Sequence, residues 1–160
     1  MAHQENLQAD GRGRGGPVIV GSHAVQESER TFKVATYNVH RCIGADNVYN
    51  PDRISAVLRS LKADLVGLQE VDSRMPAGPG MYQLDYLAVR MHAKAICGPC
   101  IQNECSHYGN ALLTRLPVID FRLIDLSVPG REPRGAIDVD IDAGGRVLRH
   151  TFYGGEVVHP

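Results

Sequence analysis

The sequence predicts an α/β (α+β) fold with a mixed sheet and helices on one face of that sheet. Two observations predict this class. Residues 32–71 carry a strand, a helix and a second strand in that order, which is the pattern of a right-handed parallel β-α-β unit. Residues 110–152 carry only short strands joined by turns and loops, which favours antiparallel pairing. The length of 160 residues fits one domain.

The β-α-β unit begins with a strand predicted over 32–39 (FKVATYNV), a segment rich in strand-forming residues. Asn50 and Pro51 predict a helix start, because Asn is a good N-cap and Pro is favoured at the first helical position. One apolar stripe runs along this helix through Ile54, Val57, Leu58 and Leu61. We therefore expect the helix to cover one face of the sheet.

The second strand of the unit is predicted over 64–71, where the apolar run is dense enough for burial on both faces. Glu70 lies near the carboxyl end of this strand, and Asn38 lies at the same end of the first strand. An ionised carboxylate is costly to bury alone, so a cation or several donors should meet Glu70. The ends of parallel strands are where sites collect in α/β folds. The sequence therefore predicts a site that contains Asn38 and Glu70.

The elements that follow are predicted from periodicity and turn residues. A helix over 83–94 has an apolar stripe made of Leu84, Leu87, Ala88 and Met91. Residues 73–80 are predicted to form a loop, and residues 95–107 are predicted to be irregular. Strands are predicted at 110–114, 118–126, 136–142 and 146–152, with a hairpin turn at Gly144-Gly145 between the last two. The alternation in 136–142 places Asp138, Asp140 and Asp142 on a solvated face.

Composition limits the classes of partner and location. The net charge is −1 and Trp is absent, so neither bulk charge nor a stacking platform indicates nucleic acid, although a few local basic groups would suffice to bind it. No apolar run reaches the roughly 20 residues of a membrane span. Residues 1–30, with GRGRGG at 11–16, lack the apolar segment of a signal peptide and predict a disordered Gly/Arg-rich leader. We therefore expect a cytoplasmic protein without a transmembrane segment.

Four segments resemble the endonuclease/exonuclease/phosphatase family, which has the fold of DNase I and neutral sphingomyelinase. They are TYNVH (36–40), LQEVD (68–72), YGNALLTRLPV (108–118) and REPRGAIDV (131–139). The resemblance implies a four-layer α/β/β/α sandwich of two similar halves. It also implies hydrolysis of a phosphodiester or phosphomonoester with Mg²⁺, or Mn²⁺ as an alternative ion. Nucleic acid, a phospholipid head group and a small phosphate ester all remain open as substrates, because selectivity in this fold lies in loops.

The resemblance also assigns roles to residues. Glu70 matches the metal-binding Glu of the family, and Asn38 matches an Asn that orients the phosphate and the catalytic carboxylate. Asn110 and Arg134 match positions that shape the phosphate cleft, whereas His40 lies within reach of substrate but gains no role from the match. The chemistry agrees, because Mg²⁺ is usually held by one or two carboxylates, with waters and substrate phosphate completing its shell.

Motifs that the family carries further along are missing from this sequence. A Thr-His pair, a Gly-Asp-x-Asn segment and a Ser-Asp-His are not found after Arg149. Residues 31–149 are thus predicted to be the N-terminal part of such a domain, and 150–160 a divergent tail left by a truncation or a change of reading frame. Because catalytic groups act as a unit, we expect weak or no activity. The alternative at the level of class is a non-catalytic fragment.

The missing part has a structural consequence for the expected sandwich. Two packed sheets share a core about 10 Å thick. Losing much of the second sheet would uncover the inner face of the first. Large exposed apolar patches promote association. We therefore expect poor solubility, or self-association through an uncovered sheet face.

A cysteine cluster offers a different kind of site. Its members are Cys97, Cys100, Cys105 and His107. The CGPC segment has the spacing of a thioredoxin-like redox pair, and the four residues together suggest zinc. A redox motif should follow a strand and open a helix, whereas this one follows a predicted helix and enters a loop. The four ligands also fall within eleven residues, which is compressed for a zinc site. Cysteines in a Gly-Pro loop are the simpler interpretation.

Overall fold

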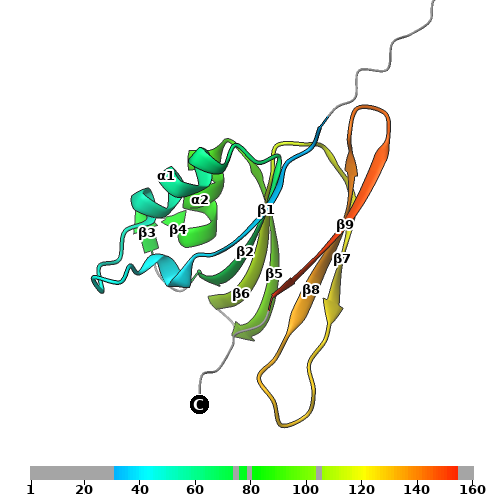
Figure 1. Cartoon of the computed structure of the whole chain (residues 1–160). Coiled ribbons are helices and arrows are strands. Elements are labelled where there is room, and N and C mark those ends of the chain that lie inside the picture. Colours follow the sequence, from blue (N-terminus) through cyan, green and yellow to red (C-terminus); the bar gives the residue numbers. More distant parts are fainter. Residues whose placement is uncertain (1–30, 74–75, 79–80, 104–105, 155–160) are drawn as a thin grey trace, which may run out of the picture. The chain divides into compact units, whose positions relative to one another are not determined.

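The computed structural model describes residues 31–73, 76–78, 81–103 and 106–154. The predicted leader at 1–30 and the end of the predicted tail at 155–160 lie outside the described residues. In chain order the elements are β1 (Val34–Asn38), the 3₁₀ turn η1 (His40–Cys42), α1 (Pro51–Leu61), β2 (Leu65–Asp72), β3 (Pro76–Gly78), β4 (Met81–Tyr82), α2 (Gln83–Met91), β5 (Lys94–Asn103), β6 (Ser106–Thr114), β7 (Val118–Asp125), β8 (Gly135–Asp142) and β9 (Val147–Gly154) (Figure 1).

A mixed four-stranded sheet with the order β1-β2-β6-β5 lies between two helices and a second sheet (Figure 1). β1 and β2 are parallel, and the other neighbours are antiparallel. The predicted β-α-β unit and the mixed sheet are therefore confirmed. Both helices pack on one face of this sheet around a helix-side core, which includes Leu58, Leu68, Leu87 and Leu113. Neither helix in the described part of the chain is long and apolar enough to cross a membrane.

The helix α1 begins where the sequence predicts. The side-chain oxygen of Asn50 accepts a hydrogen bond from the backbone N–H of Arg53 at 2.9 Å, and Pro51 occupies the first helical position. Lys62 takes a left-handed conformation with φ 50° and ends the helix. A left-handed residue at the end of a helix allows the last carbonyl groups to accept hydrogen bonds. Here the N–H of Lys62 donates to the carbonyl of Arg59 at 3.2 Å.

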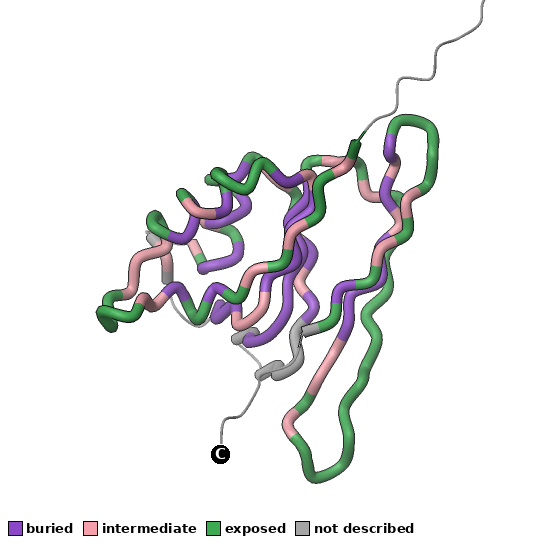
Figure 2. Tube along the Cα trace, in the orientation of Figure 1, coloured by how far each residue is buried: buried purple, intermediate pink, exposed green. Residues whose placement is uncertain are grey.

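The second sheet has the order β7-β8-β9 and is antiparallel throughout. It packs on the first sheet through an inter-sheet core of Leu65, Ile96, Leu112, Ile137, Val139, Ile141 and Phe152. The buried strands on both sides of this core are purple in Figure 2. The inner face of the first sheet is therefore covered over β2, β6 and β5, while Val34 of the edge strand β1 is 43% exposed. The layers of helices, sheet and sheet confirm the sandwich fold.

Two glycines allow the sheets to approach closely. A Cβ on Gly67 of β2 would lie 2.1 Å from Cδ1 of Phe152 in β9. A Cβ on Gly98 of β5 would lie 2.5 Å from Cγ1 of Ile137 in β8. Real Cβ atoms do not come so near to other carbons, so each glycine provides the space that a large side chain of the opposite sheet fills.

The prediction of irregular structure over 95–107 was wrong, because most of that segment belongs to β5 and β6. Gly98 and Pro99 suggested a turn, but Gly98 serves inter-sheet packing. Pro99 lies on an edge strand beside a register shift, where the missing N–H is tolerated. Two boundaries also differ from prediction. The second helix ends at Met91 rather than 94, because His92 turns left-handed with φ 50°. The predicted loop at 73–80 contains the short strand β3, which pairs with β4 directly after it.

The predicted solvated face of β8 was wrong for Asp138. Its side chain is only 7% exposed. Arg122 of β7 forms an ion pair with it, and Oγ1 of Thr151 in β9 donates to it at 2.9 Å. The hydrogen bond from Arg122 lowers the pKa of Asp138. Asp140 is similarly held by Arg149, whose Nη2 lies 2.6 Å from the carboxylate. The arginines that pair with these carboxylates come from the neighbouring strands β7 and β9. The period-two pattern of β8 alone therefore could not predict the ion pairs.

Candidate active site

Asn38 and Glu70 are in direct contact at the carboxyl ends of two adjacent parallel strands. The register of β1 and β2 places Asn38 beside Gln69, and the N–H of Val39 donates to the carbonyl of Gln69 at 3.0 Å. The amide Nδ2 of Asn38 then donates to Oε1 of Glu70 at 2.5 Å. Parallel pairing thus brings together the two side chains that the sequence placed at the ends of these strands.

Glu70 lies in a β-bulge. β2 pairs with β6 up to Leu68 and again from Val71, and a register shift separates the two stretches. Leu68 and Val71 both pack in the helix-side core, although residues three apart in a regular strand face opposite ways. Glu70 has φ 55°, a left-handed conformation that is uncommon for a residue other than glycine. Bulges of this kind re-aim side chains and cluster near active sites.

The bulge turns two consecutive side chains to one face. Nε2 of Gln69 donates to Oγ1 of Thr36 at 2.5 Å, while Glu70 accepts from Asn38. Thr36 and Asn38 are two residues apart in β1 and therefore share a face. The alternate residues of β1 pack against the helix-side core, so the shared face is the one directed away from the helices. Without the extra residue, Glu70 would face the helices instead.

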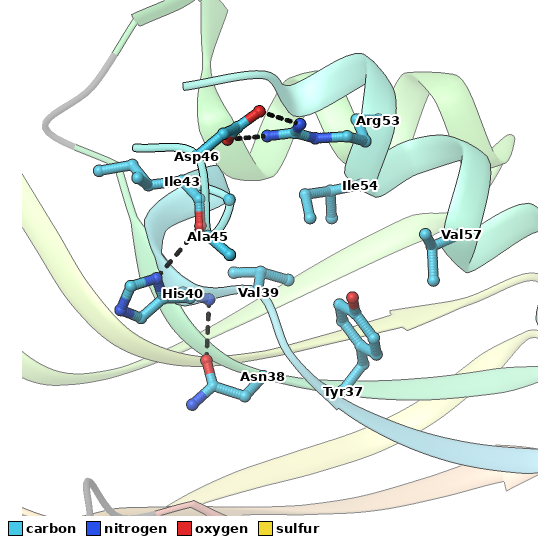
Figure 3. Close-up of a pocket in the computed structure, with 11 residues that line it drawn as sticks. Tyr37, Asn38, Val39, His40, Ile43, Ala45, Asp46, Arg53, Ile54 and Val57 are labelled. Carbon is cyan, nitrogen blue, oxygen red and sulfur yellow. Dashed lines mark hydrogen bonds and ion pairs between the residues drawn. The ribbon is translucent and has the colours of Figure 1, made fainter. Parts of the chain in front are cut away.

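The turn that follows β1 sets the orientation of the Asn38 amide. His40, Arg41 and Cys42 all have positive φ, at 46°, 54° and 58°. The turn directs the N–H of His40 at Oδ1 of Asn38, at a distance of 2.8 Å (Figure 3). With its oxygen held by His40, the Asn38 side chain presents its NH₂ group to Glu70. The imidazole Nδ1 of His40 lies 3.1 Å from the carbonyl oxygen of Ile43.

A buried amide joins the turn to the end of β2. Nε2 of Gln83 donates to the carbonyl of Arg41, and Oε1 of Gln83 accepts from the N–H of Asp72, each at 2.9 Å. Gln83 has no exposed surface. The Arg41 guanidinium lies over the ring of Tyr108, 4.9 Å from its centre. The sequence analysis missed Gln83, although a polar residue four positions before Leu87, on the apolar stripe of α2, was a signal for it.

The other residues assigned by resemblance lie on β6, the strand next to β2, and in the loop before β8. Asn110 of β6 lies opposite the bulge, and its Nδ2 donates to the carbonyl of Gly135 at 2.8 Å. This bond links the two sheets. Arg134 precedes Gly135, and its Nη1 lies 3.3 Å from Oη of Tyr153 in β9. Asn38, His40 and Glu70 thus form one contact group, Asn110 adjoins it on the next strand, and Arg134 is directed at β9.

A cavity of about 450 Å³ lies between the turn and α1 (Figure 3). Tyr37, Val39, Ile54 and Val57 contribute apolar walls, and Asn38 and His40 also line it. Arg53 and Asp46 form a two-pronged ion pair there, with N···O distances of 2.7 and 3.0 Å. The hydrogen bonds from Arg53 lower the pKa of Asp46 to about 2. This pair holds the loop that follows the turn against the start of α1.

Glu70 is the carboxylate that could bind a metal ion at this site. Oε1 accepts from Asn38, and the described residues place no second donor on the carboxylate. No group of three or more His, Cys, Asp or Glu side chains able to hold a metal occurs among the described residues. Mg²⁺ needs no such group, because one or two carboxylates with waters and substrate phosphate satisfy it. A single carboxylate donor therefore fits Mg²⁺.

Of the predicted cysteine cluster, the structure describes the side chain of Cys97 alone. Cys97 lies in β5 and packs against the helix-side core, and burial raises the pKa of its thiol. The side chains of Cys100, Cys105 and His107 lie outside the description. Cys42 is fully buried, and burial raises the pKa of its thiol to about 12. Both described thiols therefore stay protonated near neutral pH, unlike reactive cysteines.

Comparisons with known proteins agree with this geometry. The sequence profile of the Endonuclease/Exonuclease/phosphatase family matches residues 35–157. An uncharacterized protein of Escherichia coli, YbhP, is 32% identical over 121 residues, which cover 70% of this chain and 47% of that protein. This chain therefore spans about half the length of the curated relatives it matches.

Two solved structures show the same fold. An endonuclease/exonuclease/phosphatase from Beutenbergia cavernae has 26% identity and a TM-score of 0.58, and the match covers 75% of this chain and 37% of that one. TDP2 from D. rerio, complexed with a single-strand DNA product, has 15% identity and a TM-score of 0.53, with 75% and 44% covered. The profile match covers most of the chain, so this chain belongs to the endonuclease/exonuclease/phosphatase family.

Proposed function

We propose that the site at Asn38 and Glu70 serves metal-assisted hydrolysis of a phosphate ester. Family membership supports phosphoesterase- or nuclease-like hydrolysis at a coarse level, and the family is generally dependent on divalent metal. The observation that carries the proposal is the hydrogen bond between Asn38 and a Glu70 held in a left-handed bulge. Unfavourable backbone geometry that the surrounding structure maintains is a common feature of functional sites.

Glu70 would hold Mg²⁺, or Mn²⁺ as the alternative ion, through its carboxylate. The bound ion would supply polarisation of the phosphoryl oxygen and charge stabilisation of the leaving oxygen. Asn38 would keep the carboxylate in one orientation through its hydrogen bond. His40, at the turn beside Asn38, would contact substrate, and Asn110 and Arg134 would shape the cleft that receives the phosphate.

We propose that this chain alone is weakly active or inactive. The Gly-Asp-x-Asn and Ser-Asp-His motifs are absent from the sequence, and removing members of a catalytic unit loses most of the rate. A non-catalytic fragment remains the alternative at the level of class. It predicts a folded protein with neither metal binding at Glu70 nor hydrolysis.

The substrate is proposed only as a class. A TDP2 of the same fold is complexed with a single-strand DNA product, which keeps nucleic acid among the candidates. The net charge of −1 gives no general attraction for a polyanion, so a phospholipid head group or a small phosphate ester stands beside it. The location that we propose is the cytoplasm.

The decisive experiment separates metal binding from turnover. Mn²⁺ binding, followed by electron paramagnetic resonance, and hydrolysis of bis-p-nitrophenyl phosphate with Mg²⁺ are measured on the chain, on Glu70→Gln and on the control Asp85→Asn. Asp85 is an exposed carboxylate on α2. We expect Glu70→Gln to lose Mn²⁺ binding and any hydrolysis, while Asp85→Asn retains both. Equal Mn²⁺ binding in the chain and in Glu70→Gln would refute the metal role of Glu70. Stoichiometric zinc in the purified protein would instead favour the cysteine cluster.

A further inference from the structure

The strand β7 is an exposed apolar edge. It occupies one end of the second sheet and pairs only with β8 within that sheet. Seven of its eight residues are exposed (Figure 2). Ile119, Phe121 and Leu123 are 55%, 48% and 53% exposed. Natural proteins usually protect such edges, because unpaired N–H and C=O groups beside apolar side chains invite pairing with another chain.

The apolar side chains of β7 continue the inter-sheet core beyond its covered part. Phe121 pairs with Val139 of β8, and Leu123 pairs with Ile137. Both partners are buried in the inter-sheet core. Directly paired residues of neighbouring strands point to the same face, so Phe121 and Leu123 lie on the core-facing side of the second sheet. Their exposure marks the place where the first sheet no longer covers that side.

The charged residues of β7 lie on the opposite face. Asp120 pairs with Asp140 of β8, and Arg122 pairs with Asp138. Asp120 and Arg122 flank Phe121, so the strand carries one negative and one positive side chain symmetrically about an aromatic residue. This arrangement is complementary to itself when the strand is reversed.

We propose that β7 pairs antiparallel with β7 of a second copy of this chain, about a two-fold axis at Phe121. In that register Asp120 lies opposite Arg122 of the second copy, within the regular part of β7 that follows the register shift between Val118 and Asp120. The two Phe121 rings face each other at the axis. The three-stranded sheets of the two copies join into one continuous sheet with an apolar face. The contact is isologous, which is the usual form of a homodimer.

Charge selects this register over its neighbours. Directly paired residues of antiparallel strands point to the same face of the sheet. The two-fold axis must therefore pass between two copies of the same residue, and the alternative registers are those with the axis at a different residue. An axis at Asp120 would place the two Asp120 side chains directly opposite each other, and an axis at Arg122 would do the same for arginine. Like charges in directly opposite positions are destabilising. Only the axis at Phe121 pairs opposite charges at both positions.

The dimer should be weak and dependent on concentration. A single pair of eight-residue strands gives an interface at the low end of the range for specific complexes. We expect sedimentation analysis to show conversion from monomer to dimer between about 1 µM and about 1 mM. This inference uses none of the residues of the proposed phosphoesterase site, so the two can fail independently.

A charged residue at the axis tests the interface. Phe121→Lys places two lysines opposite each other, and we expect it to weaken the dimer by at least about tenfold. The matched control is Val89→Lys, which introduces the same charge at an exposed apolar residue of α2 (58% exposed) and should leave dimerisation unchanged. Circular dichroism establishes that both variants are folded. A chain that stays monomeric up to about 1 mM, or a dimer that Phe121→Lys leaves intact, would overturn the proposal.

Cross-linking tests the register itself. Phe121→Cys brings two cysteines together at the axis, within the span that a disulfide requires. Leu123→Cys is the control, because the two copies of residue 123 lie four positions apart along the strands, or roughly 13 Å. We expect mild oxidation to yield a covalent dimer with Phe121→Cys well above the level from the native cysteines, and not with Leu123→Cys. Equal cross-linking by both variants would contradict the register.

Discussion

The amide of Asn38 donates a hydrogen bond to Oε1 of Glu70, so the carboxyl ends of β1 and β2 meet through their side chains. The same amide accepts from the N–H of His40 through its oxygen. One side chain therefore couples the turn after β1 to the bulge in β2. The orientation of the carboxylate is set before any ligand arrives, which is the arrangement that an efficient site requires.

The strained backbone at Glu70 predicts a stability difference between small residues. We expect Glu70→Gly to be more stable than Glu70→Ala by about 1 kcal/mol, because glycine adopts φ 55° freely and alanine does not. Gln69 has no positive φ, so Gln69→Gly should be less stable than Gln69→Ala. Urea unfolding of the four variants measures both differences. Equal stability of the two Glu70 variants would mean that the left-handed conformation costs nothing there.

Removal of the buried amide of Gln83 should destabilise the turn and the end of β2 together. In Gln83→Leu the hydrogen bonds to the carbonyl of Arg41 and from the N–H of Asp72 are both lost, and a hydrogen bond of this kind contributes about 1 kcal/mol. We expect a loss of about 2 kcal/mol or more in the free energy of unfolding. Asp85→Leu, an exposed change on the same helix, should stay within about 0.5 kcal/mol.

The contact between Gly67 and Phe152 should produce strong coupling between two mutations. Gly67→Ala alone forces a Cβ to within 2.1 Å of the ring, so we expect a loss of about 1–3 kcal/mol through overpacking. In a Phe152→Ala background the ring is gone and the added methyl group has space. A double-mutant cycle by chemical denaturation should therefore show that Gly67→Ala costs much less in that background. Additive losses would contradict the close approach of the two sheets.

The ion pair of Asp46 and Arg53 predicts a dependence of stability on pH. Its hydrogen bonds lower the pKa of Asp46 from 3.8 to about 2, so the folded protein binds this proton less tightly than the unfolded chain does. The resulting stabilisation is fully present above the unfolded value and is lost as pH falls through the folded value. We expect the stability advantage of the native protein over Asp46→Asn to be constant from pH 5 to 8 and to shrink between about pH 4 and pH 2. A difference that grows on acidification would have the wrong sign.

Much of the local structure could be predicted because it depends on neighbours in the chain. The Asn50-Pro51 start of α1, the apolar stripes of both helices and the alternation of β8 are set by contacts within a few residues. The bulge at Glu70 could not be predicted from the sequence, because Leu68 and Val71 are both apolar and could face either side of the sheet. Its presence is decided by pairing with β6, which comes forty residues later.

By itself the sequence determined the β-α-β unit, the mixed sheet, the family resemblance and the adjacency of Asn38 and Glu70, since each follows from short-range pattern or from parallel pairing. Only the tertiary structure decided that Gly98 spaces two sheets rather than making a turn, and that Asp138 is buried beneath Arg122. It also decided that Gln83 bridges two distant segments and that the face of Phe121 is left uncovered. These features depend on which strand or sheet lies opposite each residue, and a pattern of local hydrophobicity carries no information about that partner.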